Sequence, residues 1–360
     1  MNRIILIGNG FDLAHNIKTS YSDFIMDFWE KEKGSVISNL NENLYESPYY
    51  YNDDVVEVKS HFKIHKTNSS AETVKGYVWF QKLQTLSIHD CDGTQHFTEV
   101  NYKNLFLNTI SKKGTLQNWL DIEYEYYLLL IKCLRKNNDY NIENLNNDFL
   151  FIQNALIDYL RNQLSVPVYP LPSIKEKIYS NLTNDYYSTN IGLLPSSNKI
   201  FFINFNYTNL INLYIDNVSD NLIHMHGELN NSENPIIFGY GDELDENYKA
   251  IENMNDNRYF NHIKSFHYSK TRNYKKMLSF IEPEPYQVYI MGLSCGKSDR
   301  TLLNTLFEHK NCNAIKIYYH KRRDDTDNYF DVYSNISRNF NNKQLMRKVV
   351  INKEDSESLI

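Results

Sequence analysis

The first 24 residues of the chain constrain its fold more than any other stretch. An apolar run, Ile4–Ile7, stops at Gly8-Asn9-Gly10 and continues directly into a helix-like segment. An uninterrupted, partly β-branched run of this length is typical of a strand that is buried on both faces of a parallel sheet. Two glycines after such a strand allow a tight turn and a close approach of the backbone to a ligand. Backbone N–H groups and the positive end of a helix then converge on a spot that suits a phosphate group.

This turn departs from the dinucleotide-binding fingerprint, which has a third glycine where this chain has Leu13. The alternative interpretation is therefore a glycine turn between a first strand and a first helix that binds nothing. Polar residues that follow the turn favour a binding site, because an ordinary first helix rarely carries so many. They are Asp12, His15, Thr19, Tyr21 and Asp23.

Composition limits the class of protein. With 360 residues and a formal net charge of −6, the chain lacks the basic character that phosphate neutralisation requires, so a nucleic-acid partner is not expected. No stretch approaches the roughly 18 apolar residues of a membrane span, and Met1 leads into a strand instead of a signal peptide. The four cysteines lack CxxC spacing, which predicts reduced thiols and no zinc site. We expect a cytoplasmic protein without a membrane segment.

The region from residue 35 to residue 198 has no clean α/β pattern up to about residue 118, and its later part, from Trp119 to Leu164, is helical. His61 and His65 have the four-residue spacing of a helical metal pair, but no glutamate follows His61 as in a zinc-protease helix. Hydrogen-bonded or surface histidines are the better interpretation, and no metal is predicted. We interpret residues 35–198 as an inserted mixed and helical subdomain.

From Lys199 onward, strand-like and helix-like segments alternate. The expected strands are 200–203, 222–226, 235–238, 286–291, 314–319 and 349–351, and a long helical stretch is expected from 246 to 280. Such alternation predicts a parallel sheet with helices on both faces. The fold class is therefore α/β, with a Rossmann-like core formed by residues 1–34 and 199–360.

Polar or glycine residues stand at four of these strand ends. They are Gly8-Asn9-Gly10, Asn204 to Thr208, His226-Gly227 and Gly292-Leu293-Ser294. The carboxyl ends of parallel strands line one edge of an open sheet, where ligands bind, so these residues should converge. They make a poor hydrolytic triad, because no serine or cysteine nucleophile is paired with a base and an orienting acid. They fit a nucleotide-ribose site better.

Four short stretches resemble the AbiH family of bacteriophage abortive-infection proteins. They are GNGFDLAHNIKTSYSDF, WLDIE, FNYTNLI and HMHGELN, and together they span most of the chain. AbiH proteins are in turn similar in outline to the sirtuin-like branch of nucleotide-binding Rossmann folds. The resemblance implies an antiphage role and a sirtuin-like core.

The sirtuin-like resemblance also implies roles for single residues. His226 would be the general base that acts on ribose hydroxyls, Asn206 would position the nicotinamide ribose or the attacking water, and Ser294 would contact the cofactor. The residues expected to bind NAD or a related nucleotide are Gly8, Asn9, Gly10, Asp12, His15, Asp23, Asn204, Thr208, Gly227, Gly292, Ser294 and Asp299. The chain departs from the sirtuin pattern because no aspartate follows Asn206-Tyr207-Thr208. It also lacks zinc-ribbon cysteines, and this second departure argues against protein deacylation.

Simpler interpretations of these residues stay open. His226 fits a core histidine that is hydrogen-bonded at a strand end, and His224 faces the same side of its strand, so the two could exchange roles. Asp299 could cap the next helix, Ser294 could end a strand, and His15 could lie on a helix surface.

Three functions are therefore compared. The first is an antiphage effector that cleaves the N-glycosidic bond of NAD or a related nucleotide. The second is a nucleotide-binding sensor of infection that acts through a partner, with a phage-derived trigger or a second copy of the chain as further partners. The third is a nuclease-type toxin, for which the sequence offers only a basic cluster, formed by Lys264, His267, Lys270 and Arg272.

Overall fold

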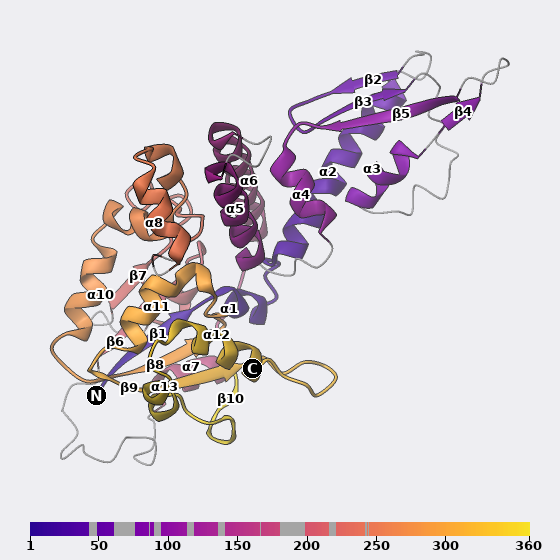
Figure 1. Cartoon of the computed structure of the whole chain (residues 1–360). Coiled ribbons are helices and arrows are strands. Elements are labelled where there is room, and N and C mark those ends of the chain that lie inside the picture. The colour runs from indigo at the N-terminus through magenta and orange to yellow at the C-terminus, as the bar shows by residue number, and fades with distance from the viewer. Residues whose placement is uncertain are drawn as a thin grey trace. The chain divides into compact units, whose positions relative to one another are not determined.

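The computed structural model describes residues 1–42, 49–60, 76–85, 87–89, 95–113, 119–135, 141–165, 167–180, 199–215, 221–241, 243 and 245–360. The chain divides into two compact units (Figure 1). Unit 1 comprises Met1–Thr19, Tyr126–Ile142 and Leu160–Ile360, and unit 2 comprises Ser20–Glu125 and Glu143–Tyr159. The histidine pair His61 and His65 lies outside the described residues.

Unit 1 contains a sheet of six strands, all of them parallel. The strands are β1 (Asn2–Ile7), β6 (Ile200–Asn204), β7 (Asn221–His224), β8 (Tyr286–Met291), β9 (Cys312–Tyr319) and β10 (Glu357–Ser358), in the order β10-β9-β8-β1-β6-β7. Counted along the chain, this is the 3-2-1-4-5-6 order of dinucleotide-binding domains, in which the direction of winding reverses between β1 and β8. The predicted Rossmann-like α/β class is confirmed.

The strand β1 is buried on both faces, as its apolar run predicted. Ile4 and Leu6 belong to one hydrophobic core, whereas Ile5 and Ile7 belong to the other. The alternation follows from the two-residue period of a strand, which sends neighbouring side chains to opposite faces. Because neither face can meet water, helices cover both.

Helices of unit 1 contribute side chains to one or the other of the two hydrophobic cores. The first core is completed by α10 (Asn273–Ile281), α11 (Arg300–Phe307), α12 (Tyr329–Asn339) and α13 (Lys343–Val349). The second is completed by α1 (Asn9–Ala14), α7 (Pro172–Tyr179) and the 3-10 helix η2 (Leu210–Tyr214). Further helical elements of the unit are α8 (Glu246–Asn253), η3 (Asn257–Phe260), α9 (Lys264–His267), η4 (Tyr268–Lys270), η5 (Lys297–Asp299) and η6 (Lys353–Asp355).

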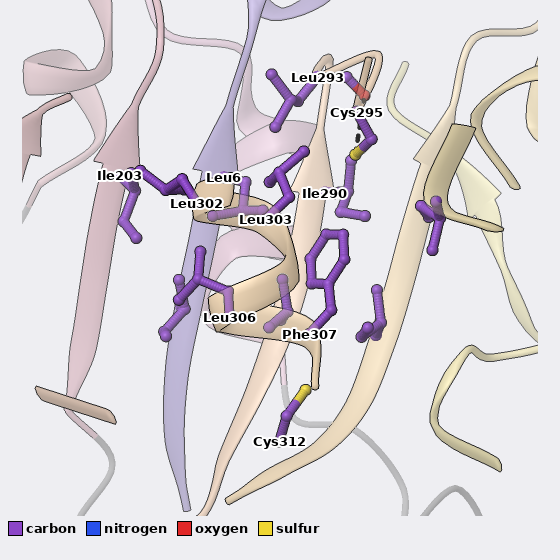
Figure 2. Packing of buried hydrophobic residues seen from close by; sticks show 14 of the residues in the cluster. Leu6, Ile203, Ile290, Leu293, Cys295, Leu302, Leu303, Leu306, Phe307 and Cys312 are labelled. Carbon is purple, nitrogen blue, oxygen red and sulfur yellow. Dashed lines mark hydrogen bonds between the residues drawn. The ribbon is translucent and has the colours of Figure 1, made fainter. Parts of the chain in front are cut away.

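Figure 2 shows how α11 packs against the sheet in the first core. Leu302, Leu303, Leu306 and Phe307 are fully buried and point from the helix toward the strands. Their spacing of three or four residues places them on one side of the helix. The start of α11 is thereby held beside the carboxyl end of β8.

Unit 2 combines helices with an antiparallel sheet. The sheet has the order β2-β3-β5-β4 and consists of β2 (Tyr49–Asn52), β3 (Val56–Ser60), β4 (Ser87–His89) and β5 (Gln95–Tyr102). The helices of this unit are α2 (Tyr21–Glu42), α3 (Tyr77–Gln84) and α4 (Leu105–Lys112), and α5 (Trp119–Leu134) and α6 (Ile142–Gln163) have residues in both units. Trp29 packs against Tyr77 and Phe80 in an aromatic core.

Two of the expected strands are absent as strands. Residues 235–238 form no strand: Pro235 has no N–H to contribute to a ladder, and Ile237 donates its N–H to the carbonyl of His226. Of residues 349–351, Val349 ends the helix α13, whose first N–H groups are capped by the Asn342 side chain. Val350 then makes a single bridge to Ile315.

The helical stretch expected from residue 246 to residue 280 is helical in the structure but is not one continuous helix. Short helices replace it, and Asn255 lies between two of them with a positive φ of 52°. Tyr240 forms a parallel bridge with Ile263, accepts a hydrogen bond from the N–H of Lys264 and donates its own N–H to His262. Because the N–H of Lys264 and the carbonyl of His262 bond to Tyr240, they are not available for the hydrogen bonds of a continuous helix.

The strand register aligns the carboxyl ends of the central strands. Ile7 lies opposite Asn204 on one side and Met291 on the other, and Asn204 lies opposite His224. The residues that follow these strands therefore leave the sheet at the same edge. No helix in the described part of the chain is long and apolar enough to cross a membrane.

The contact between the first turn and the end of β8 gives a test of the fold. Gly292 has a φ of +75°, and a Cβ atom there would lie 2.1 Å from the backbone nitrogen of Phe11. We expect Gly292→Ala to lower the free energy of unfolding by about 3 kcal/mol or more, since a left-handed conformation and a backbone clash add together. Chemical denaturation followed by circular dichroism measures the change.

Gly34→Ala is the matched control. Gly34 lies inside α2, and a Cβ atom there would meet nothing within 4 Å. This substitution should stabilise the protein by up to about 1 kcal/mol, because alanine favours a helix interior. Equal effects of the two substitutions would contradict the close contact at Gly292.

Candidate active site

A buried hydrogen-bond network joins the first turn to the end of β6. The carboxylate of Asp12 accepts hydrogen bonds from the Asn206 amide at 2.9 Å and from the Thr208 hydroxyl at 2.8 Å. The second N–H of the Asn206 amide donates to the carbonyl of Gly8 at 3.0 Å. Both N–H bonds of the amide are thus used, which fixes the orientation of the Asn206 side chain.

Asn204 and His224 form further polar contacts next to Asn206. Asn204 accepts a hydrogen bond from the backbone N–H of Asn206 at 3.0 Å, and its own amide donates to the carbonyl of Thr208 at 2.8 Å. The same amide lies 3.2 Å from Nδ1 of His224. That nitrogen therefore accepts, and the proton of the neutral ring is on Nε2, which lies 3.9 Å from Glu228. Burial lowers the pKa of His224, in agreement with a neutral ring.

No ion pair joins Asp12 to a cation among the residues that the structure describes. Its side chain is almost completely buried, and burial raises its pKa to about 7 although the bonds from Thr208 and Asn206 act in the opposite direction. Removal from water disfavours the carboxylate, and two hydrogen bonds compensate only in part. Asp12 is therefore an acid that titrates near neutral pH.

A second buried group forms around Asp299. Nε2 of His226 lies 3.0 Å from Asp299 Oδ1, and Nζ of Lys264 lies 3.2 Å from the same oxygen. All three side chains are at most 5% exposed. Lys264 also lies 3.5 Å from the Ser298 hydroxyl. A carboxylate, an ammonium group and an imidazole thus meet in the interior.

The charges in this group shift the pKa values in opposite directions. Burial lowers the pKa of His226, and Lys264 lowers it further, against the opposing effect of Asp299. Burial alone would raise the pKa of Asp299, but Lys264 and His226 together hold it well below its usual range. The group therefore contains an ionised carboxylate beside a neutral imidazole.

The tautomer of His226 follows from its partners. The backbone of Phe205 and the side chain of Asp299 both form interactions with the ring that act to raise its pKa, and Nε2 is the nitrogen that lies 3.0 Å from Asp299 Oδ1. A lone pair on Nε2 would face a lone pair of the Asp299 carboxylate at this distance, so the partners favour a proton on Nε2 that points toward Asp299. A second proton on the ring would give an imidazolium that forms an ion pair with Asp299.

Asp299 is at the N-cap position of α11, as the simpler interpretation suggested, yet its side chain makes no capping hydrogen bond. The carboxylate faces His226 and Lys264 instead. Ser294, by contrast, has an exposed side chain, and its carbonyl accepts a hydrogen bond from Asn335.

The glycines of the first turn pack against the backbone that follows β8. Gly10 donates its N–H to the carbonyl of Gly292 at 2.8 Å, and a Cβ atom on Gly8 would lie 2.4 Å from the Cα atom of Leu293. The close approach that the two glycines allow is therefore made here between two backbones. Gly227, after β7, has a φ of +88° and packs against Pro235.

The other predicted residues occupy different surroundings. Both ring nitrogens of His15 have partners, the carbonyl of Phe11 at 2.7 Å and the hydroxyl of Tyr214 at 2.5 Å. Asn9 accepts a hydrogen bond from Thr19 at 2.6 Å. Asp23 belongs to unit 2, where it accepts a hydrogen bond from Ser20 at 2.5 Å.

Sequence reasoning missed Lys264 as a member of the site. The residue was grouped with His267, Lys270 and Arg272 as a basic cluster, but it is only 2% exposed whereas Lys270 and Arg272 are exposed. No local pattern marks it, because its inward orientation depends on the bridge between Tyr240 and Ile263. In the part of the chain that the structure describes, no three His, Cys, Asp or Glu residues are grouped to hold a metal ion.

The comparisons with known proteins agree with the resemblance noted in the sequence. The family model "Bacteriophage abortive infection AbiH" matches residues 4–321. The chain belongs to the AbiH family. No curated protein and no solved structure matches it. Both buried groups lie within the matched residues.

Asp12 generates a pH dependence of stability. In the unfolded chain its carboxyl group ionises near 3.8, whereas in the folded protein it keeps its proton up to about pH 7. Its contribution to stability is therefore fully present below about pH 4 and is lost as the pH rises to about 7. Asparagine does not ionise, so the Asp12→Asn variant does not lose stability in this way. The free energy of unfolding of the variant minus that of the unmodified protein should therefore be about 1–4 kcal/mol larger at about pH 8 than at about pH 5.

Denaturant unfolding at the two pH values measures this difference. Asp331→Asn is the control, because Asp331 is exposed and its substitution should give a similar difference at both pH values. If Asp12→Asn destabilised the protein equally at both, the raised pKa of Asp12 would be wrong.

Proposed function

We propose that this AbiH protein is an antiphage effector that binds NAD or a related nucleotide at the carboxyl edge of the unit 1 sheet and hydrolyses its N-glycosidic bond. The observation that carries the proposal is the arrangement of His226, a neutral buried imidazole whose Nε2 lies 3.0 Å from an ionised Asp299. A base of this kind takes up a proton during the reaction and returns it afterwards.

The strand order supports a nucleotide as the ligand. Ligands of open parallel sheets bind outside the carboxyl ends of the strands, where the winding direction reverses. Here the reversal lies between β1 and β8, and Gly8, Gly10 and Gly292 meet at that point. Asn206 follows β6 and His226 follows β7, and these two strands come after β1 in the sheet order.

The chemistry assigns separate tasks to the residues. Hydrolysis of an N-glycosidic bond requires water to reach the anomeric carbon while positive charge develops on the ribose. The unprotonated ring nitrogen of His226 would take the proton of that water or of a ribose hydroxyl, and Asp299 would stabilise the imidazolium that results. Asn206, whose amide is oriented by Asp12 and Gly8, would hold the ribose or the water in place.

A sensor without turnover is the second candidate. The burial of Asp12, Asn206, His226 and Asp299 favours it, because buried networks also serve to hold a structure together. The sensor predicts nucleotide binding that survives the loss of the base, and the hydrolase predicts loss of turnover.

The test uses the full-length protein and three single variants. His226→Ala and Asn206→Ala should each lower the rate of NAD hydrolysis by about 10²-fold or more and prevent the fall of cellular NAD after phage challenge. His320→Ala is the control, since His320 is an exposed histidine of the same unit and its loss should leave the rate unchanged.

Circular dichroism and ligand binding by calorimetry show whether the variants fold and bind. Nucleotide binding without turnover in the unmodified protein would support the sensor. NAD levels that stay constant while the cells stop growing would refute hydrolysis of NAD and direct the search to other nucleotides.

A further inference from the structure

The Lys264 side chain has no task in the reaction proposed above. An ammonium group is rarely buried, because leaving water costs it several kcal/mol unless it is paired. Lys264 is 2% exposed, and its partner is the same Oδ1 atom of Asp299 that faces His226. The two basic groups therefore compete for one carboxylate oxygen.

The backbone brings Lys264 to this place. Its N–H donates to the carbonyl of Tyr240 at 2.9 Å, and Gly241 leaves room for it, because a Cβ atom there would lie 2.9 Å from Cβ of Lys264. Ser298, next to Asp299 in the chain, lies within 3.5 Å of its ammonium group. The contacts with Gly241 near its Cβ atom and with Ser298 at its ammonium group keep the Lys264 side chain in the interior.

We infer that Lys264 is a positioning residue that holds His226 in its neutral, proton-accepting form by supplying the positive charge that Asp299 would otherwise draw from the imidazole. This role rests on the proposed function of His226 as a base. With Lys264 charged and Asp299 ionised, the group is neutral overall, and a proton on His226 would add a buried, uncompensated charge. Without Lys264, a protonated His226 would form the neutralising pair with Asp299 itself.

The other groups near His226 do not supply this charge. Tyr268 of η4 lies parallel to the imidazole with ring centroids 6.4 Å apart, and Phe205 meets it edge to face. Burial raises the pKa of the Cys295 thiol, which interacts with Asp299, so the thiol stays neutral. Among these neighbours, Lys264 is the residue whose positive charge faces Asp299 and His226.

Two substitutions separate the charge of Lys264 from its packing. Lys264→Gln keeps a hydrogen-bond donor for Asp299 without the charge, and Lys264→Arg keeps the charge. In the full-length protein with labelled histidine, NMR titration should show the His226 pKa raised by about one pH unit or more in Lys264→Gln. In Lys264→Arg it should stay within about half a unit of the unmodified protein. His226→Ala identifies the resonance.

The NMR titration needs no substrate, so its outcome is independent of the proposed hydrolysis. A His226 pKa that is unchanged or lowered in Lys264→Gln would overturn the inference. If this variant fails to fold, Asp299→Asn provides the second measurement, since removal of the carboxylate should lower the His226 pKa further, and a rise would overturn the inference.

The pH profile of turnover gives the matching readout. In Lys264→Gln the fall in rate toward acid should move to higher pH by the same amount as the His226 pKa, with the rate restored in alkaline solution. A purely structural role of Lys264 would lower the rate equally at every pH, and this result would also overturn the inference. Absence of turnover in the unmodified protein would refute the proposed function and leave the NMR result standing.

Discussion

The close contact between the first turn and the backbone after β8 is the constraint on which the rest of the candidate site depends. Gly10 can donate its N–H to Gly292 only because neither residue carries a side chain. This contact holds α1 at the edge of the sheet, from which Asp12 reaches Asn206 and Thr208. Asn206 in turn follows Phe205, whose ring and backbone contact His226. The two buried groups are therefore linked through three consecutive strand ends.

The two buried carboxylates in unit 1 show how a partner decides the protonation of an acid. Asp12 and Asp299 are similarly buried, and burial acts to raise the pKa of both. Asp12 has only neutral hydrogen-bond donors, so its pKa stays raised, to about 7. Asp299 has an ammonium group and an imidazole within 3.2 Å, so its pKa is lowered. One sheet edge thus holds an acid that can be neutral and an acid that is always charged near neutral pH.

Much of the fold and part of the site could be predicted from local sequence. The unbroken apolar runs of β1, β6 and β8 identify strands buried on both faces, because no other arrangement removes every side chain of such a run from water. Polar residues directly after those runs then had to meet at one edge, since parallel strands end on the same side. Asp12, Asn204, Asn206, Thr208, His226 and Asp299 do lie in the two buried groups there.

The sequence by itself determined the AbiH family, the parallel α/β class and the strand ends at which polar residues gather, because each depends on short contiguous patterns. Only the tertiary structure decided which side chains pair. Asp299 faces His226 and Lys264 instead of capping α11, and Lys264 is buried instead of joining a surface cluster. Residues 235–238 likewise form no strand, and Val349 of the stretch 349–351 ends the capped helix α13. The physical reason is that pairing depends on distances between segments tens of residues apart, and these distances are fixed by packing and not by local propensity.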